Sequence, residues 1–277
     1  MPQELQVVKS NHIISASYRL SAVEQRLILS CIAQVRRDEE ITDEVLYSVT
    51  AAEFAKLCGT DQKTAYRDLA AAADRLLERR ITIMFEPNGE ARPERKRRTV
   101  WVQTADYIEK EGRVELRFGK DILPFLIGLT EQFTRYALSA VSNMSSAYAI
   151  RLFELLAQFG SVGSREISVE QLRDWFQLED RYPLMADLRR WVIEPAVAQV
   201  NEHSPLAVKW EQRKTGRKVT HLVFTFGPKK TTKPAAKGAN TALTPADMTD
   251  TEMAAHARPG ETWEQLRARL RKAGTAA

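Results

Sequence analysis

The chain has 277 residues, 44% of them hydrophobic and 28% charged, which is the composition of a soluble globular protein with room for one or two domains. Lys and Arg exceed Asp and Glu by 5 charges, and an excess of this size suggests a polyanionic partner. No apolar stretch approaches the ~20 residues that cross a bilayer, and the amino terminus lacks the basic flank and apolar core of a signal peptide. We therefore expect a cytoplasmic protein with no membrane partner.

The residues that usually carry catalysis form no recognisable motif. Cys31 and Cys58 lie among apolar residues without a His or Cys at metal-ligand spacing. The histidines form no paired motif, and neither a phosphate-binding loop nor a nucleophile elbow is present. We expect no enzyme, no metal and no cofactor; an active site assembled from distant residues is the alternative.

Helix signals in the first half predict a helix-turn-helix. Ser21 with Glu24, and Thr50 with Glu53, have the spacing of capping boxes that begin helices. Gly59 ends the second of these helices, and a longer helix follows over about residues 62–79. A short helix, a turn and a longer helix make a helix-turn-helix. The expected buried face of the longer helix consists of Ala65, Leu69, Ala72 and Leu76.

Three strands are predicted after this unit, over residues 81–85, 99–108 and 114–118. Strands directly behind a helix-turn-helix form a wing. A basic run lies between the first two strands, and we expect its residues to contact DNA phosphates from a loop. The run contains Arg92, Arg95, Lys96, Arg97 and Arg98.

The second half repeats this order. An apolar helix over residues 147–159, capped by Ser145 or Ser146, is followed by a capping pair, Ser168 with Gln171. A longer helix is expected over residues 185–201, and a hairpin over 206–226 turns at Gly216.

The predicted fold is α+β, with two tandem winged-helix domains at residues 1–135 and 136–227. A change to Lys, Pro and Ala predicts a flexible basic tail at 228–277, with a possible short helix over 262–272.

The helix near residue 185 has the features of a recognition helix. At about 100° per residue, a buried face centred on Leu188 includes Trp191, Val192 and Pro195. Arg190 then points away from the core and Arg189 lies at its edge, where arginine can bind guanine through O6 and N7. An equally weighted alternative is a solvated helix in which these arginines pair with Asp187 or Glu194.

Basic residues on the following hairpin favour the DNA-binding interpretation, since they are placed to neutralise phosphates. They are Lys209, Arg213, Lys214, Arg217 and Lys218. On the first long helix, the corresponding base-reading candidates are Lys63, Thr64 and Arg67.

Several segments resemble the replication initiators of iteron plasmids. The resemblance covers about residues 7–227 and rests on LSAVEQRLIL at 20–29, YAIRLFELL at 148–156, RRWVIEPA at 189–196, GRKV at 216–219 and FTF at 224–226. It implies two winged helices related by pseudo-two-fold symmetry that straddle one DNA repeat. By position, base reading falls on Arg189 and Arg190, and phosphate contact on the hairpin.

The resemblance also implies partners. Monomers of the family bind tandem direct repeats at the origin, open the adjacent duplex and bring in the host initiator and replicative helicase. Homodimers joined through the first domain bind an inverted repeat and repress the initiator's own gene. A winged-helix transcriptional repressor without a replication role is the main alternative, and a relaxase or primase is the third.

Overall fold

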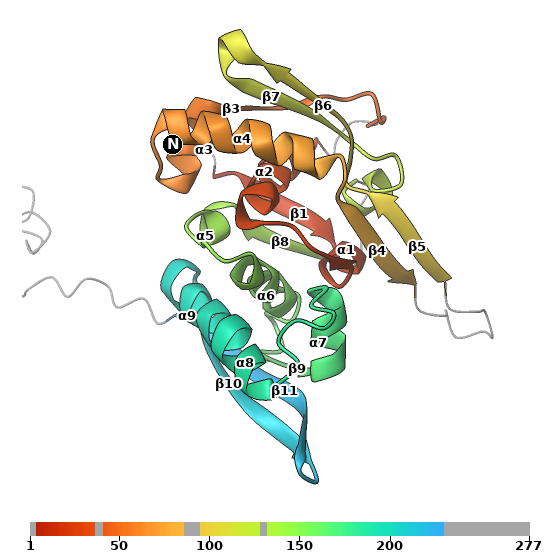
Figure 1. Cartoon of the computed structure of the whole chain (residues 1–277), viewed down its shortest axis with the longest axis vertical. Helices are drawn as coiled ribbons and strands as arrows, with labels where there is room; N and C mark the ends of the chain where they lie inside the picture. The colour runs from red at the N-terminus through yellow and green to blue at the C-terminus, as the bar shows by residue number, and fades with distance from the viewer. Residues whose placement is uncertain (1–3, 37–40, 86–94, 128–131, 230–277) are drawn as a thin grey trace, which may run out of the picture. The chain divides into compact units, whose positions relative to one another are not determined.

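The computed structural model describes residues 4–36, 41–85, 95–127 and 132–229 (Figure 1). Arg92 and the expected short helix over 262–272 lie outside these residues.

The first winged helix begins with β3 (Tyr47–Thr50) and contains α3 (Ala51–Cys58) and α4 (Gln62–Leu76). The predicted capping box of Thr50 and Glu53 is present, and Gly59 ends α3 with a φ of 64°, which glycine adopts without steric cost. Its wing consists of β6 (Val102–Ile108) and β7 (Arg113–Phe118), joined by η1 (Glu109–Glu111). The sheet order is β3-β7-β6.

The second winged helix repeats this topology. Strand β9 (Ser164–Ser168) precedes α7 (Val169–Trp175), and the recognition helix consists of α8 (Met185–Leu188), η3 (Arg189–Ile193) and α9 (Glu194–His203). The wing is β10 (Leu206–Thr215) with β11 (Lys218–Pro228), in the order β10-β11-β9. In both sheets, the strand before the helix-turn-helix pairs with the second wing strand. The prediction of two winged helices in an α+β fold is confirmed.

The single strand predicted over residues 99–108 is wrong, and the difference changes the sheet topology of the first half. Residues 99–108 form two strands in different sheets, β5 (Arg95–Val100) and β6, separated by the buried Trp101. Strand β5 pairs with β4 (Arg80–Phe85), which pairs with β2 (Ser17–Tyr18). The first winged helix therefore carries an additional hairpin between recognition helix and wing, whereas β10 directly follows α9. No glycine or proline in the sequence marks the break at Trp101.

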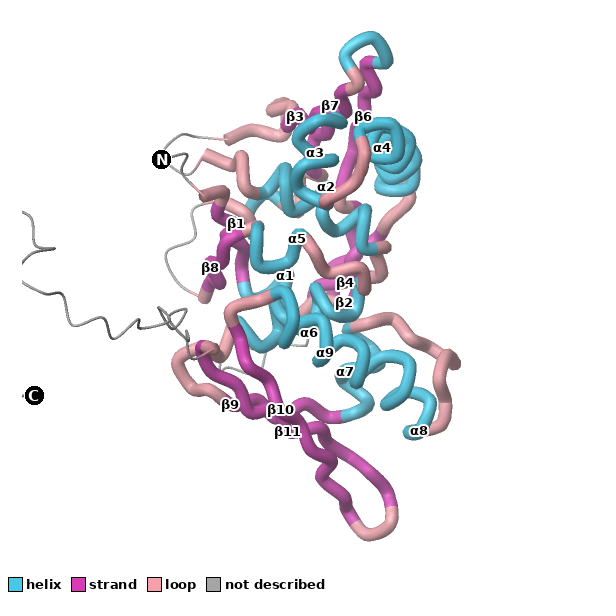
Figure 2. Tube along the Cα trace, turned by 90° about the vertical axis from the view of Figure 1, so that its left-hand side faces the viewer, coloured by secondary structure: helices cyan, strands magenta, loops and turns pink. Residues whose placement is uncertain are grey.

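Several elements were not predicted because their pairing is long-range. Strand β1 (Gln6–Ser10) pairs with β8 (Phe133–Ala137), and Figure 2 shows the two side by side. Nearby lie the short elements α1 (Asn11–Ile14), η2 (Leu123–Phe125) and α5 (Ser139–Ser142). By contrast, α2 (Ala22–Ile32) begins at Ser21 with the predicted capping box.

Helix α6 (Ala147–Ala157) lies in the middle of the core and is buried on nearly every face. It packs against α9 on one side and against α1, α2 and β8 on others, which agrees with the apolar helix expected from the sequence. Ser146 is its N-cap residue, but the side chain makes no capping hydrogen bond.

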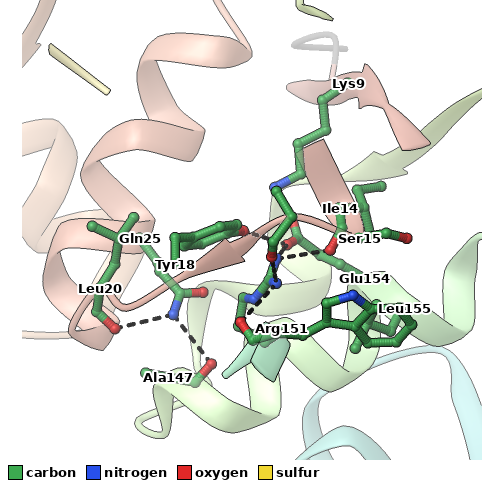
Figure 3. Close-up of polar contacts among 12 residues, drawn as sticks. Lys9, Ile14, Ser15, Tyr18, Leu20, Gln25, Ala147, Arg151, Glu154 and Leu155 are labelled. Atoms are coloured by element: carbon green, nitrogen blue, oxygen red, sulfur yellow. Dashed lines mark hydrogen bonds and ion pairs between the residues drawn. The ribbon is translucent and has the colours of Figure 1, made fainter. Parts of the chain in front are cut away.

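A buried carboxylate on α6 joins the N-terminal segment to the core (Figure 3). Lys9 of β1 places its Nζ 2.5 Å from Glu154 Oε1, and both side chains are at most 2% exposed. The hydroxyls of Tyr18 and Tyr136 also donate to this carboxylate. Burial, followed by the negative charge of Glu154, raises the pKa of Tyr136 well above its usual value.

One turn earlier on α6, Arg151 reinforces the same junction. Its guanidinium donates to the carbonyl oxygens of Ile14, Ala16 and Trp175 and lies 3.7 Å from the ring centroid of Tyr18. One side chain therefore connects α1, β2 and α7 to α6.

A second buried carboxylate connects α2 to the end of α4. Glu24 accepts hydrogen bonds from Arg75 at 2.6 Å and from Arg79 at 3.0 Å, and it also accepts the Ser21 amide. Burial alone would raise the pKa of Glu24, but the bonds from Arg79, Ser21 and Arg75 outweigh it and hold the pKa below its usual value.

We predict that Glu154→Gln strongly destabilises the protein, because Lys9 is then left buried without a counter-charge. The expected loss is about 3 kcal/mol in the free energy of unfolding, measured by urea titration. Glu170→Gln, at an exposed position on α7, is the control and should change stability little. Equal stability of the two variants would contradict a structural role for the buried pair.

We also predict a pH dependence that originates from Glu24. Because its folded pKa is depressed, the stabilisation is present above the unfolded pKa of about 4.5 and is lost as the pH falls through the lower folded pKa. Glu24→Gln should lower stability at pH 7 by about 2 kcal/mol and flatten the decline in stability below pH 4.5. Thermal unfolding over a pH series measures both effects, with the exposed Glu78→Gln as the control.

Candidate nucleic-acid interface

The second recognition helix contains a π turn at its centre. In η3, the amide of Glu194 bonds to the carbonyl of Arg189, five residues earlier. Pro195 follows at the start of α9 and has no amide hydrogen to donate to residue 191, which removes one α-helical bond at this point. The proline therefore explains the wide turn.

The wide turn changes which residues the helix buries. Val192 and Ile193 are both buried together with Leu188, whereas Trp191 is 55% exposed. The prediction that Trp191 lies in the core is therefore wrong, because a constant 100° step assumes α-helical bonding throughout. Arg190 is exposed, as predicted.

The two arginines of the π turn differ in their partners. Arg189 makes an ion pair of 3.0 Å with Glu194, the contact proposed for a solvated helix. The Arg190 guanidinium instead lies 5.0 Å from the ring centroid of Trp191, and it makes no ion pair within the described part of the chain. Arg190 is therefore the better placed of the two to bind an external acceptor.

A groove separates this helix from the wing. Figure 1 shows the β10–β11 hairpin extending beyond α8, with its turn at the far end. Basic side chains enter the groove from both sides. Those of the helix are Arg189 and Arg190, and those of the hairpin are Lys214 and Arg217.

The basic residues of this wing lie on two different faces, a division that we did not predict from the sequence. Lys214 lies opposite Val219, and both line the groove. A bulge separates Lys214 from Arg213, which lies opposite His221 on the other face. There, Arg213 donates to both carboxylate oxygens of Glu166 at 2.8 and 2.9 Å.

The remaining two lysines, Lys209 and Lys218, lie on the same face of the hairpin as Arg213 or at its edge. Residues in directly opposite positions share a face, and faces alternate along each strand. Lys209 lies four residues before Arg213, and Lys218 lies opposite Thr215 beside the same site. The groove thus receives Lys214 and Arg217, while Lys209, Arg213 and Lys218 lie on the far face or its edge.

In the first winged helix, the predicted reading residues occupy the first turns of α4. Lys63 and Arg67 are exposed and Thr64 is half-buried. The side chain of Asp61 accepts the Thr64 amide, and bonds from Thr64 hold the pKa of this exposed carboxyl below its usual value. Arg67 lies 3.3 Å from its neighbour Asp68 yet keeps 76% of its side chain exposed.

The wing beside α4 differs in charge from the second wing. Tyr107 of β6 packs edge-on against Tyr66 at 5.3 Å, and Gly112, with a φ of 57°, lies against the same ring. The tip between them carries Glu109 and Glu111. Lys110 lies between these glutamates and Arg113 pairs with Glu111 at 3.1 Å, so the tip is not basic and the expectation of two basic wings is wrong.

The basic run lies on the additional hairpin and not in a wing loop. Arg95 and Arg97 share a face with Phe85, at 5.2 and 5.7 Å from its ring centroid, and Arg97 pairs with Asp121 at 3.3 Å. Lys96 and Arg98 are exposed on the opposite face. Pairing of strands, which the sequence run does not reveal, divides these four residues into two sets.

Arg80 is a cation of this hairpin that we did not predict as a candidate site residue from the sequence. It lies opposite Val100, on the face of the β4–β5 hairpin that also carries Lys96 and Arg98, and it is exposed. Because side chains alternate between the two faces of a strand, counting back two residues from Thr82 would have placed Arg80 on this face.

Within the described residues, no three His, Cys, Asp or Glu side chains are placed to hold a metal ion, and no helix is long and apolar enough to cross a membrane. Burial raises the pKa of the Cys31 and Cys58 thiols.

Two family models match the chain in sequence. The model "Initiator Replication protein, WH1" matches residues 6–157, and "Initiator Rep protein, WH2" matches residues 168–226.

Two proteins of Escherichia coli are also similar to the chain. A 27.6 kDa uncharacterised protein is 28% identical over 82% of this chain and 97% of its own length. A replication initiation protein is 28% identical over 80% of this chain and 69% of its own. Among solved structures, the Pi initiator protein in complex with iteron DNA matches with a TM-score of 0.68 and 21% identity, over 83% of this chain and all of that one.

We predict unequal effects of two neighbouring cations on binding to random-sequence duplex DNA. Lys214→Ala should reduce the slope of log affinity against log salt by roughly one unit, because one phosphate contact is lost. Arg213→Ala should change the slope by much less, because Glu166 already neutralises Arg213. Fluorescence anisotropy over a salt series measures both slopes. Equal losses of slope for the two variants would show that Lys214 and Arg213 contribute equally to DNA binding, although they lie on different faces of the hairpin.

Proposed function

The chain belongs to the family of initiator replication proteins, and on this premise we propose that it starts plasmid replication by binding tandem direct repeats, or iterons, at the origin. Two helix-turn-helix units, each followed by a hairpin, provide two surfaces for one duplex. The observation that carries the proposal is Arg190, which is exposed and pairs with no carboxylate among the described residues, beside a groove that Lys214 and Arg217 also enter. The fold shared with the Pi initiator, whose structure contains iteron DNA, supports it.

Base reading in this proposal depends first on Arg190, because a bidentate arginine–guanine pair needs a guanidinium that is not held elsewhere. Arg189 reads a base only if it exchanges Glu194 for DNA. Lys63, Thr64 and Arg67 on α4 read a second major-groove segment.

Phosphate binding follows the division of faces. Lys214 and Arg217 bind the backbone next to the recognition helix. Lys96 and Arg98 contact phosphates from the additional hairpin, whereas Arg95 and Arg97 mainly support that hairpin through Phe85. Lys209, Arg213 and Lys218 contribute only where DNA reaches the far face of the wing.

The two winged helices have different roles in this proposal. The second, within residues 136–227, supplies most of the sequence-specific binding. The first, within residues 1–135, divides its surface between DNA and a second copy of the chain. Dimers bind an inverted repeat and repress the chain's own gene.

Initiation itself needs no catalytic group from this chain. Bound monomers strain and open the adjacent duplex, and the host initiator and replicative helicase then load on it in the cytoplasm. The family description favours this over the alternative of a winged-helix repressor. A single palindrome beside the gene, without direct repeats, would favour the repressor.

We predict that Arg190→Ala weakens binding to an origin repeat about tenfold to a hundredfold, the range for loss of one bidentate base contact. Binding to random-sequence DNA and its salt slope should change much less. Gel-shift titrations with both duplexes at several salt concentrations provide the measurement.

Arg135→Ala is the charge-matched control, because Arg135 is exposed on β8 and lines a separate pocket near His203, at the opposite end of α9 from Arg190. It should leave the ratio of specific to non-specific affinity unchanged. If Arg190→Ala bound the repeat as tightly as the unmodified chain, the assignment of the reading surface would be wrong.

A further inference from the structure

Trp191 is an exposed indole on the second recognition helix. Its exposed fraction is 55%, whereas Trp101 and Trp175 are at most 7% exposed. Large aromatic side chains contribute most when they are buried, so an indole left in water indicates a surface that another molecule covers. Trp191 lies within the π turn, between the buried Leu188 and the buried Val192 and Ile193.

Arg190 and Trp191 form one continuous surface. The guanidinium lies 5.0 Å from the indole centroid, within the range of a cation–π contact, and both side chains point away from Leu188 and Val192. The contact restricts Arg190 to a part of its rotamers, which reduces the entropy lost when it binds an acceptor. A guanidinium group that can donate two parallel hydrogen bonds therefore lies directly beside the flat apolar ring of the indole.

We infer that Trp191 is a specificity-determining residue that contacts the C5-methyl group of a thymine next to the base read by Arg190. In the major groove, this methyl group is the apolar feature that distinguishes thymine from the other bases, and apolar side chains read it. The inference rests on the proposed DNA-binding function.

Charge favours DNA over a protein as the occupant of this surface. Arg190 flanks the indole directly, and Lys214 and Arg217 enter the adjacent groove. A phosphate backbone complements this distribution of cations. A second copy of the chain would bring the same cations into apposition.

The test uses the full chain and a duplex that it enriches from a random-sequence library. Each thymine of that sequence is replaced in turn by deoxyuridine, which removes only the methyl group. The unmodified chain should lose affinity about fourfold at one or two positions, equivalent to ~0.8 kcal/mol for one such group. Trp191→Ala should bind the natural sequence more weakly by at least this factor and should no longer respond to deoxyuridine at those positions.

Two variants serve as controls. Trp191→Phe retains an aromatic ring and should retain most of the response to deoxyuridine. Val162→Ala removes a side chain that is 66% exposed in the turn between α6 and β9 and should respond like the unmodified chain.

Three outcomes would overturn the inference: an unchanged deoxyuridine response in Trp191→Ala, no sensitive thymine for the unmodified chain, or a change in oligomeric state alone, which would indicate a protein contact. Failure of the proposed function looks different. The enriched sequence would then be absent from direct repeats beside the gene, while the thymine response could still be present.

Discussion

A carboxylate in the middle of α6 receives an ammonium group from β1 and hydroxyl groups from β2 and β8. An uncompensated charge at this depth costs several kcal/mol, and the ion pairs of Glu154 with Lys9 at 2.5 Å and with Arg151 at 4.0 Å offset this cost. The same helix holds Arg151, whose bonds extend to α1, β2 and α7. Segments between Lys9 and Tyr18 and the helix-turn-helix of the second half are therefore held by one short stretch of α6.

The two winged helices share a topology but not a surface. The second has a recognition helix whose Arg190 makes no ion pair with any other described residue, and a wing whose groove side is basic. The first has a wing tip of mixed charge, and its basic run lies on an additional hairpin that follows α4. Since the sheets have the same strand order, the difference arises from side chains and from one inserted hairpin. Two winged helices with the same backbone topology thus expose different distributions of charge.

Local signals in the sequence predicted local structure well. Ser21, Thr50 and Gly59 act within one helical turn, and the structure contains the caps that they predict. Pairing between distant segments could not be predicted in this way. The β1–β8 pair joins residues more than a hundred positions apart, and the bond from Arg213 to Glu166 requires the order of strands to be known.

In the candidate site, too, local features could be predicted from the sequence and features set by the wider structure could not. Sequence periodicity placed Arg190 on the outside of its helix, but the same periodicity placed Trp191 inside. Pro195 was the available signal for the difference, because its missing amide hydrogen allows a wider turn. Alternation along β10 already separates Lys214 from Lys209 and Arg213. The face of Lys218 on β11 depends on the register shift after Arg213, which the sequence did not predict.

A π turn is equivalent to one extra residue within an α-helix, and its position in this protein has an evolutionary consequence. The segment after it, from Glu194 onward, is fixed in phase by its packing against α6. The segment before it is rotated relative to that anchor, so its exposed residues can change without disturbing the packing of α9, whereas Leu188 is buried. Descendants of such a protein could acquire a new target sequence by changing a few residues ahead of the turn, while the stability of the fold is inherited unchanged.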